Sequence, residues 1–265
     1  MRKFFFILMI LICISVAGYA SYKLVSTGME YREGRVTYER VSSQFTLEHK
    51  AAATEKEEPA VKKRKVQDSS PKPPMEIGWE GLKQENPDIV GWIYVEGVEG
   101  ISYPILKAED NDYYLHRLVD RTYNFAGSIF MDAQNSSDFT DPHTIIYGHN
   151  MQDRSMFGNL REFRENAAYN KSPYFWILTP ERSMRYRIFC IATIGNYDRL
   201  YTLFPERSSE YKDWLSYVES ISIVPLEHEQ LSEASTVVTL STCFGSGDGV
   251  KECDIGVLEN IIDGN

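Results

Sequence analysis

The stretch VVTLSTCFG, residues 237–245, runs from a strand-like segment into a cysteine, Cys243, and a glycine-rich loop. Its residues Thr236–Thr242 are rich in β-branched side chains, which predicts a short strand. A second stretch, TIIYGHN at residues 144–150, likewise leads an apolar strand into a histidine, His149. Strands that deliver a cysteine and a histidine to loop ends suit nucleophilic catalysis, because both side chains are held while a carbonyl approaches.

The chemistry of a cysteine nucleophile requires a partner. An ordinary thiol has a pKa of about 8.5 and is only slightly ionised at neutral pH, whereas the thiolate is the reactive form. A nearby imidazole favours the thiolate and later protonates the leaving amine. The spacing alone leaves another interpretation open, because a single histidine or cysteine at a strand end is more often a surface or packing residue.

Outward from these two segments, the chain from residue 75 has the pattern of short strands separated by turn signals. The expected strands are Ile89–Val95, Gly100–Ile105, Gly127–Met131, Thr144–Tyr147, Tyr174–Leu178, Arg185–Ile194 and Thr236–Thr242. The expected helices are Trp79–Glu85, Ser155–Glu165 and Ser208–Ile221, the last two from apolar residues at helical spacing. This pattern predicts a mainly β fold, a barrel or sandwich with short inserted helices.

Two basic residues precede an apolar run from Phe4 to Ala20, which apolar residues up to Val25 extend. This length is near the lower limit for crossing a bilayer. A signal peptide cleaved near Gly18 and Ala20 is the alternative. We favour an uncleaved anchor, because the run is long for a signal core and the small-residue site is imperfect. In both cases the N-terminus is expected in the cytoplasm and the rest of the chain outside.

The composition predicts three parts: a signal or transmembrane anchor at 1–25, a polar stalk and disordered linker at 26–74, and a globular domain at 75–265. Residues 29–50 could form a helix that leads away from the membrane. Residues 51–74 are nearly free of large apolar side chains, which is typical of a linker. The basic run at 62–65 resembles a nuclear localisation signal, but beside an export segment a solvated or headgroup-facing charge run is favoured.

Charge and cysteine usage exclude several classes of protein. The formal net charge of -10 opposes nucleic-acid binding, which depends on neutralising phosphates. The four cysteines form no CxxC pair, so neither a zinc site nor a disulfide framework is expected, and Cys190 is interpreted as a small buried hydrophobe. We expect no metal and no cofactor. Acidic residues such as Asp248 and Asp254 are interpreted as solvated loop residues.

Several linked motifs resemble the sortase family. TLSTC at residues 239–243 is similar to the TLxTC signature of sortases, and its serine is typical of class B. YGHNM at residues 147–151, followed by Met156-Phe157 and Leu160, resembles the class B histidine segment. Further matches are Tyr103-Pro104-Ile105, Asp110-Asn111, Tyr113-Tyr114-Leu115 and Gly127–Asp132, so that the resemblance runs from about Gly78 to Ile262.

The resemblance implies a closed eight-stranded sortase-type β-barrel with short inserted helices, whose last strand is Cys253–Ile262. This barrel would follow the N-terminal transmembrane helix expected from the apolar run. It implies that Cys243 attacks the carbonyl after Thr in an Asn-Pro-x-Thr-like sorting motif of a secreted protein, with His149 as acid/base. An amine from a peptidoglycan cross-bridge or a pilin then resolves the thioester. By position, the residues expected to line the sorting-motif groove are Asn111, Leu115, Tyr147 and Ser241. For Leu115 and Tyr147, ordinary core packing remains the alternative.

The sequence departs from the family at one position. Sortases carry an arginine shortly after the cysteine, but this chain has none after Arg207. The best candidate is Lys251, eight residues after Cys243, because this register sets Gly256 at a position that is usually small. A second register would put Cys253 in the arginine position. Lysine offers a point charge rather than a planar fork, and losing one oxyanion donor typically lowers rates about 10²–10³-fold.

Two other functions are alternatives to an active transpeptidase. A sortase-like protein that binds sorting motifs or pilins without efficient turnover is favoured by the missing arginine. A papain-type protease is disfavoured, because the histidine precedes the cysteine in the chain and the local cysteine signature of that group is absent.

Overall fold

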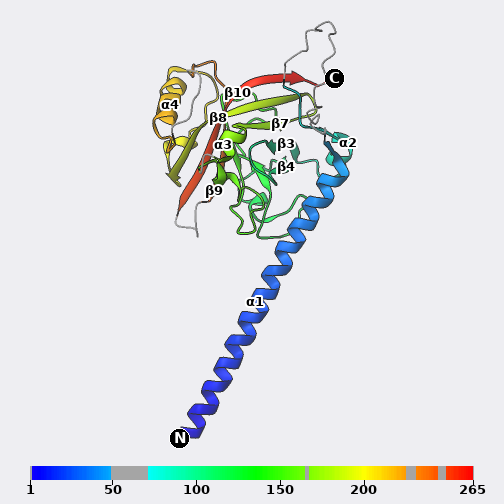
Figure 1. Ribbon diagram of the computed structural model, residues 1–265, viewed down its shortest axis with the longest axis vertical. Coiled ribbons are helices and arrows are strands. Elements are labelled where there is room, and N and C mark those ends of the chain that lie inside the picture. Colours follow the sequence, from blue (N-terminus) through cyan, green and yellow to red (C-terminus); the bar gives the residue numbers. More distant parts are fainter. Residues whose placement is uncertain (1, 49–70, 165–166, 225–230, 244–248, 265) are drawn as a thin grey trace, which may run out of the picture.

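The computed structural model describes residues 2–48, 71–164, 167–224, 231–243 and 249–264, and of Glu48, Ala167 and Cys243 the backbone alone. Figure 1 shows a long helix, α1 (Arg2–Phe45), that runs from the N-terminus to a barrel formed by the rest of the chain. The expected linker lies largely outside the described residues, as does the basic run at 62–65.

Strands β3 to β10 close a barrel among the described residues, in the order β10-β8-β7-β3-β4-β5-β6-β9. Their bounds are β3 (Ile89–Val95), β4 (Ser102–Leu106), β5 (Ile129–Met131), β6 (His143–Tyr147), β7 (Tyr174–Leu178), β8 (Arg182–Gly195), β9 (Val237–Cys243) and β10 (Val250–Asp263). Two neighbouring pairs, β4–β5 and β6–β9, are parallel, and the others are antiparallel. The predicted mainly β fold with a closed barrel is confirmed.

The barrel interior is filled by large apolar side chains, among them the fully buried Trp92, Phe175 and Leu240. The last strand runs close to this core at Gly256, where an added Cβ would lie 2.3 Å from the Phe175 ring. Only glycine therefore fits there without a shift of the core. The closing strand is longer than expected, because its whole length pairs with β8.

A second, smaller core lies outside the barrel. Helix α4 (Ser209–Ser220) begins after Ser208, whose side chain accepts a hydrogen bond from the Tyr211 N–H. Its buried residues Tyr211, Trp214, Leu215 and Val218 follow helical spacing and pack against β8 and β10. Cys190 of β8 is fully buried, with Sγ 3.2 Å from the Val218 carbonyl oxygen, so its interpretation as a packing residue is confirmed.

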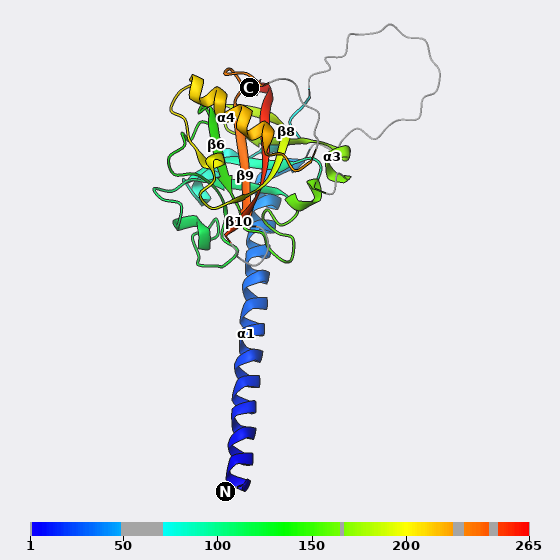
Figure 2. The same cartoon turned by 90° about the vertical axis from the view of Figure 1, so that its left-hand side faces the viewer.

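Helix α1 has two different parts. Its apolar first part is exposed, and among the described residues α1 is the helix that is long and apolar enough to cross a bilayer. Its last turns bury Gly34, Thr37, Tyr38 and Val41 against the barrel, at the three- and four-residue spacing of one helix face. Figure 2 shows from the side how the first part extends away from the barrel. Its end continues into β1 (Thr46–Glu48), which pairs with β2 (Met75–Ile77), and α2 (Trp79–Glu85) follows.

The helix expected at Ser155–Glu165 is wrong. A short 3₁₀ turn, η2 (Leu160–Phe163), stands there, and Arg154 and Met156 have φ angles of 67° and 54°, which no right-handed helix accepts. The apolar spacing reflects burial of Met156 and the turn residues in the main core instead. The other short elements are η1 (Tyr113–His116), α3 (Ala167–Lys171) and η3 (Arg199–Tyr201).

Candidate active site

The segments of Cys243 and His149 lie side by side at one barrel edge. Strands β6 and β9 pair in parallel, with Tyr147 opposite Ser241, so their carboxyl ends reach the same edge. The Gly148 N–H extends this pairing to the Ser241 carbonyl oxygen at 3.1 Å. The strand ends therefore bring the backbones of the two predicted segments together, as a cysteine–histidine site requires.

A cavity of about 220 Å³ opens at this edge. The side chains predicted for the site that the structure describes all line it, namely Asn111, Leu115, Tyr147, His149, Ser241 and Lys251. Phe130 and Thr242 line it as well. Residues separated by up to 140 positions in the chain (from Asn111 to Lys251) thus form one small pocket beside the end of β9.

His149 is half-buried and held by a backbone group. Its Nε2 lies 2.8 Å from the carbonyl oxygen of Leu115. Because a carbonyl only accepts hydrogen bonds, Nε2 carries the hydrogen, and in the neutral ring Nδ1 is left as the nitrogen that can take a proton. The ring also stacks on that of His116, with centroids 5.6 Å apart and planes 18° apart. The imidazole is therefore fixed in both tautomer and plane.

One wall of the pocket is organised by Asp132. This buried carboxylate accepts hydrogen bonds from the Asn111 side-chain amide and the Tyr147 hydroxyl, both at 2.9 Å through Oδ2. Burial, together with the negative charge of Asp132, raises the pKa of Tyr147, so this hydroxyl remains a hydrogen-bond donor. Asn111 also accepts the Ala133 N–H at 2.8 Å, so its amide supports the wall of the pocket as well as lining it.

Tyr201, which lines the neighbouring cavity, holds the pocket residue Ser241. Its hydroxyl lies 2.8 Å from the Ser241 Oγ and 3.8 Å from the Cys253 Sγ. Asp132 and Tyr201 are the site residues that sequence reasoning missed. Asp132 ends the matched segment Gly127–Asp132, which is the signal that could have found it. Tyr201 lies in η3, 40 residues before its partner Ser241, and nothing in its sequence context indicates this contact.

The register of β9 and β10 decides which residue faces Cys243. Lys251 stands opposite Cys243, and Cys253 stands opposite Ser241. The half-buried Lys251 also lines a neighbouring cavity with Tyr197 and Tyr201. Cys253 is fully buried, and this burial raises the pKa of its thiol to about 12. The backbone pairing thus corresponds to the register that puts Lys251, rather than Cys253, beside the cysteine.

The interpretation of Asp254 as a solvated loop residue is wrong. It lies within β10 and is fully buried, and among the described residues neither of its carboxylate oxygens has a hydrogen-bond partner. Two residues earlier, the buried Glu252 forms a 3.2 Å ion pair with Arg164. Burial, and next the charge of Glu252, raise the pKa of Asp254 well above its ordinary value. Asp248 lies outside the described residues.

A closed mixed barrel with cysteine and histidine segments at the ends of two parallel strands is the architecture that the resemblance to sortases implies. The comparison with protein-family models found no match. Sortase B of Listeria monocytogenes is 37% identical over 171 residues, which cover 64% of this chain and 68% of that protein. Sortase B of Staphylococcus aureus is 26% identical over 243 residues, covering 92% and 91% of the two chains.

The solved structures give the same result. A crystal structure of sortase B from B. anthracis matches with a TM-score of 0.68 at 25% identity, covering 88% of this chain and 99% of that one. The chain belongs to the sortase B family. It is therefore a sortase-type cysteine transpeptidase.

Proposed function

We propose that Cys243 is the nucleophile and His149 the acid/base of a transpeptidation that cleaves the sorting motif of a secreted protein. The Cys243 thiolate attacks the carbonyl carbon of Thr. The C–N bond after Thr then breaks as protonated His149 gives its proton to the leaving amine. An acceptor amine then attacks the thioester, loses its proton to His149 and releases the thiolate. The observation that carries this proposal is the pocket at the joined ends of β6 and β9, which contains His149.

The proposed substrate is an extended Asn-Pro-x-Thr-like segment, and the proposed acceptor is an amine of a peptidoglycan cross-bridge or a pilin. A cavity of about 220 Å³ accommodates one or two side chains of such a segment, not a folded protein. Tyr147 and Ser241 offer hydroxyl groups to it, and Leu115 offers an apolar contact. Lys251 is proposed as the cation beside the oxyanion, in the position of the family's arginine.

We further propose that α1 anchors the enzyme, with the N-terminus in the cytoplasm and the barrel outside. Support comes from an 18-residue window of mean hydropathy 2.4 in α1 and from the two basic residues that precede the apolar run. The last turns of α1 pack on the barrel, which would hold the pocket near the membrane surface.

Mass spectrometry of the full chain in detergent tests the proposal. The chain is incubated with a panel of sorting-motif peptides, first alone and then with candidate amines. We expect a peptide thioester on Cys243 that disappears when an amine is added, and no adduct in Cys243→Ala. Cys190→Ala is the matched control, since this buried thiol lies in β8 and does not line the pocket. Peptide binding without any adduct would contradict the proposal and favour a binding protein.

A further inference from the structure

The last turns of α1 contact the loop of the barrel at residues 124–128. The Asn124 side-chain amide donates a hydrogen bond to the Glu30 carbonyl oxygen at 3.0 Å. The rings of Tyr31 and Phe125 meet edge to face at 4.8 Å. About two helical turns after Tyr31, Tyr38 contacts the end of the same loop. The helix is therefore attached to this loop over about two turns.

Tyr38 makes the most buried of these contacts, with 6% of its surface exposed. Its hydroxyl donates a hydrogen bond to the Gly127 carbonyl oxygen at 2.9 Å and lies 2.8 Å from the Ser128 Oγ. The Ser128 Oγ in turn donates to the Arg117 carbonyl oxygen at 2.7 Å. Through Ser128, the hydroxyl of Tyr38 thus connects α1 to Arg117, the residue that directly follows η1.

Gly127 lies against the carbonyl group of Leu115, which is the group that holds His149. It has a φ angle of 58°, and an added Cβ would lie 2.3 Å from the Leu115 carbonyl oxygen. That oxygen accepts the hydrogen bond of the His149 Nε2. The Ser128 N–H also donates to the Tyr114 carbonyl oxygen at 3.0 Å, which couples the two segments further. Tyr38 therefore lies behind the backbone that orients the imidazole.

The ring of Tyr38 reaches the other support of His149. It packs edge to face on Tyr103 at 5.3 Å, and the Tyr103 hydroxyl accepts the Met156 N–H at 3.2 Å. The next residue, Phe157, donates its N–H to the His149 carbonyl oxygen at 3.0 Å. Tyr38 is thus connected both to the imidazole of His149, through Gly127 and Leu115, and to its backbone, through Tyr103 and the segment 156–157.

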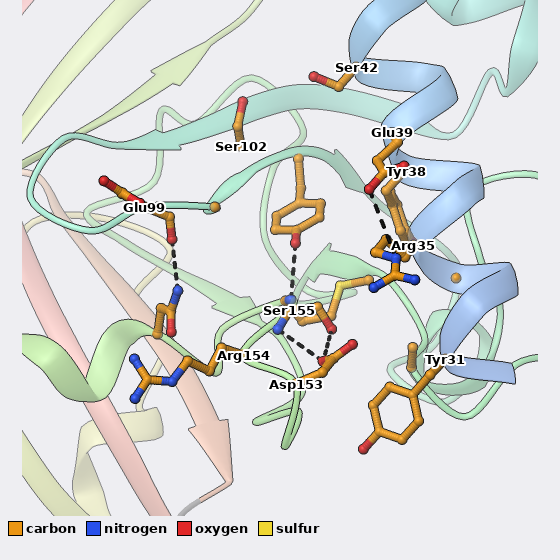
Figure 3. A pocket seen from close by; sticks show the side chains of 16 residues that line it. Tyr31, Arg35, Tyr38, Glu39, Ser42, Glu99, Ser102, Asp153, Arg154 and Ser155 are labelled. Atoms are coloured by element: carbon orange, nitrogen blue, oxygen red, sulfur yellow. Dashed lines mark hydrogen bonds and ion pairs between the residues drawn. The ribbon is translucent and has the colours of Figure 1, made fainter. Parts of the chain in front are cut away.

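Other residues of the same helix face line a cavity together with the loop after His149. A cavity of about 620 Å³ separates Tyr31, Arg35 and Glu39 from the segment 153–156, as Figure 3 shows. The polar groups around it are largely paired locally, for example the Asp153 carboxylate with the Ser155 hydroxyl. Tyr38 is thus the residue of α1 whose hydrogen bond to Gly127 and ring contact with Tyr103 lead to the groups that hold His149.

We propose that Tyr38 is a positioning residue for His149, so that the end of the helix expected to be a stalk belongs to the catalytic unit. The inference rests on the proposed acid/base role of His149. The Tyr38 hydroxyl holds Gly127 against the Leu115 carbonyl group, and this carbonyl keeps the hydrogen of the imidazole on Nε2. The globular domain expected from residue 75 lacks this support.

The test uses the full chain in detergent and compares Tyr38→Phe with Tyr31→Phe. Both variants keep an aromatic ring on the same helix, but Tyr38→Phe alone removes a hydroxyl that bonds to the loop 124–128. We expect the kcat of thioester formation to fall about tenfold in Tyr38→Phe, roughly the effect of one hydrogen bond, with little change in KM. Tyr31→Phe should behave as the wild type.

The ring ¹⁵N signals of histidine-labelled protein provide a readout that does not need turnover. The His149 signals are assigned by their loss in His149→Ala. We expect the Nε2-protonated tautomer in the wild type and in Tyr31→Phe, and a mixture of tautomers in Tyr38→Phe. Ser128→Ala, which removes the hydroxyl between Tyr38 and Arg117, is the substitute variant if Tyr38→Phe does not fold. It should likewise shift the His149 signals toward a mixture of tautomers.

Unchanged His149 signals together with an unchanged rate in Tyr38→Phe would overturn the inference, even if the variant melts at a lower temperature. A wild-type chain that forms no thioester would instead refute the proposed function. In that case the tautomer comparison still decides whether Tyr38 positions the ring. The two failures are therefore distinguishable.

Discussion

Replacing Asp254 by Asn should change the pH dependence of stability. The carboxyl group is fully buried in β10, and in the part of the chain that the structure describes neither of its oxygens has a hydrogen-bond partner. Burial and then the nearby Glu252 raise its pKa, while the more distant charge of Arg164 opposes this only in part. The folded protein therefore favours the protonated, neutral form of Asp254, and Asn copies that form at every pH.

Proton linkage gives the sign and size of the change in the free energy of unfolding with pH. A group whose pKa is raised on folding stabilises the protein fully below its unfolded pKa, about 3.9 for Asp, and that contribution is lost as the pH rises toward the folded pKa. One such group changes the free energy of unfolding by up to about 1.4 kcal/mol per pH unit. Two pH units within this window amount to about 2.7 kcal/mol, or roughly 5–11 °C in Tm for a chain of this size.

Thermal unfolding of the full chain in detergent, followed by circular dichroism from pH 4 to pH 8, measures the effect. We expect the Tm curves of the wild type and Asp254→Asn to meet at pH 4 and to separate as the pH rises, with the variant more stable. Asp213→Asn, at an exposed position of α4, is the matched control and should follow the wild type. Parallel curves for Asp254→Asn and the wild type would refute the reasoning.

Three further predictions concern the site and the core. Lys251→Arg should keep or raise the rate of thioester formation, because the guanidinium group can donate two hydrogen bonds at once. A collapse of the rate would show that the site requires the lysine side chain. Asp132→Asn should raise the peptide KM several-fold, since it weakens a charge-assisted bond from Tyr147; an unchanged KM would mean that this wall does not contact substrate. Gly256→Ala should lower stability by about 1–3 kcal/mol in denaturant unfolding, because its Cβ meets Phe175, and wild-type stability would contradict this packing.

Much of the barrel was predictable because its strands are locally distinct. The expected strand bounds of Ile89–Val95 and Tyr174–Leu178 and the helix Trp79–Glu85 agree with the structure residue for residue. In these segments, β-branched or aromatic composition and the neighbouring turn signals act in the same direction as the tertiary packing. The cysteine and histidine segments were found for the same reason, since each ends a short apolar strand in a loop.

The failures occurred where local pattern and packing disagree. The apolar spacing of Ser155–Glu165 imitates a helix, but its side chains enter the core from a turn with two left-handed residues. Asp254 has the composition of a loop but the burial of a core residue, because β10 pairs on both sides along this stretch. Neither outcome can be derived from neighbouring residues alone.

The order of the motifs, most of the strands and the candidate pair of Cys243 and His149 were predictable from the chain, because each depends on residues close together in it. The residues that surround that pair were not predictable without the folded structure. Asp132, Tyr201 and Tyr38 support the pocket through contacts between distant segments, and such contacts depend on strand pairing and helix docking that no local pattern encodes. The same holds for the position of Lys251 opposite Cys243, which is set by the register of two paired strands.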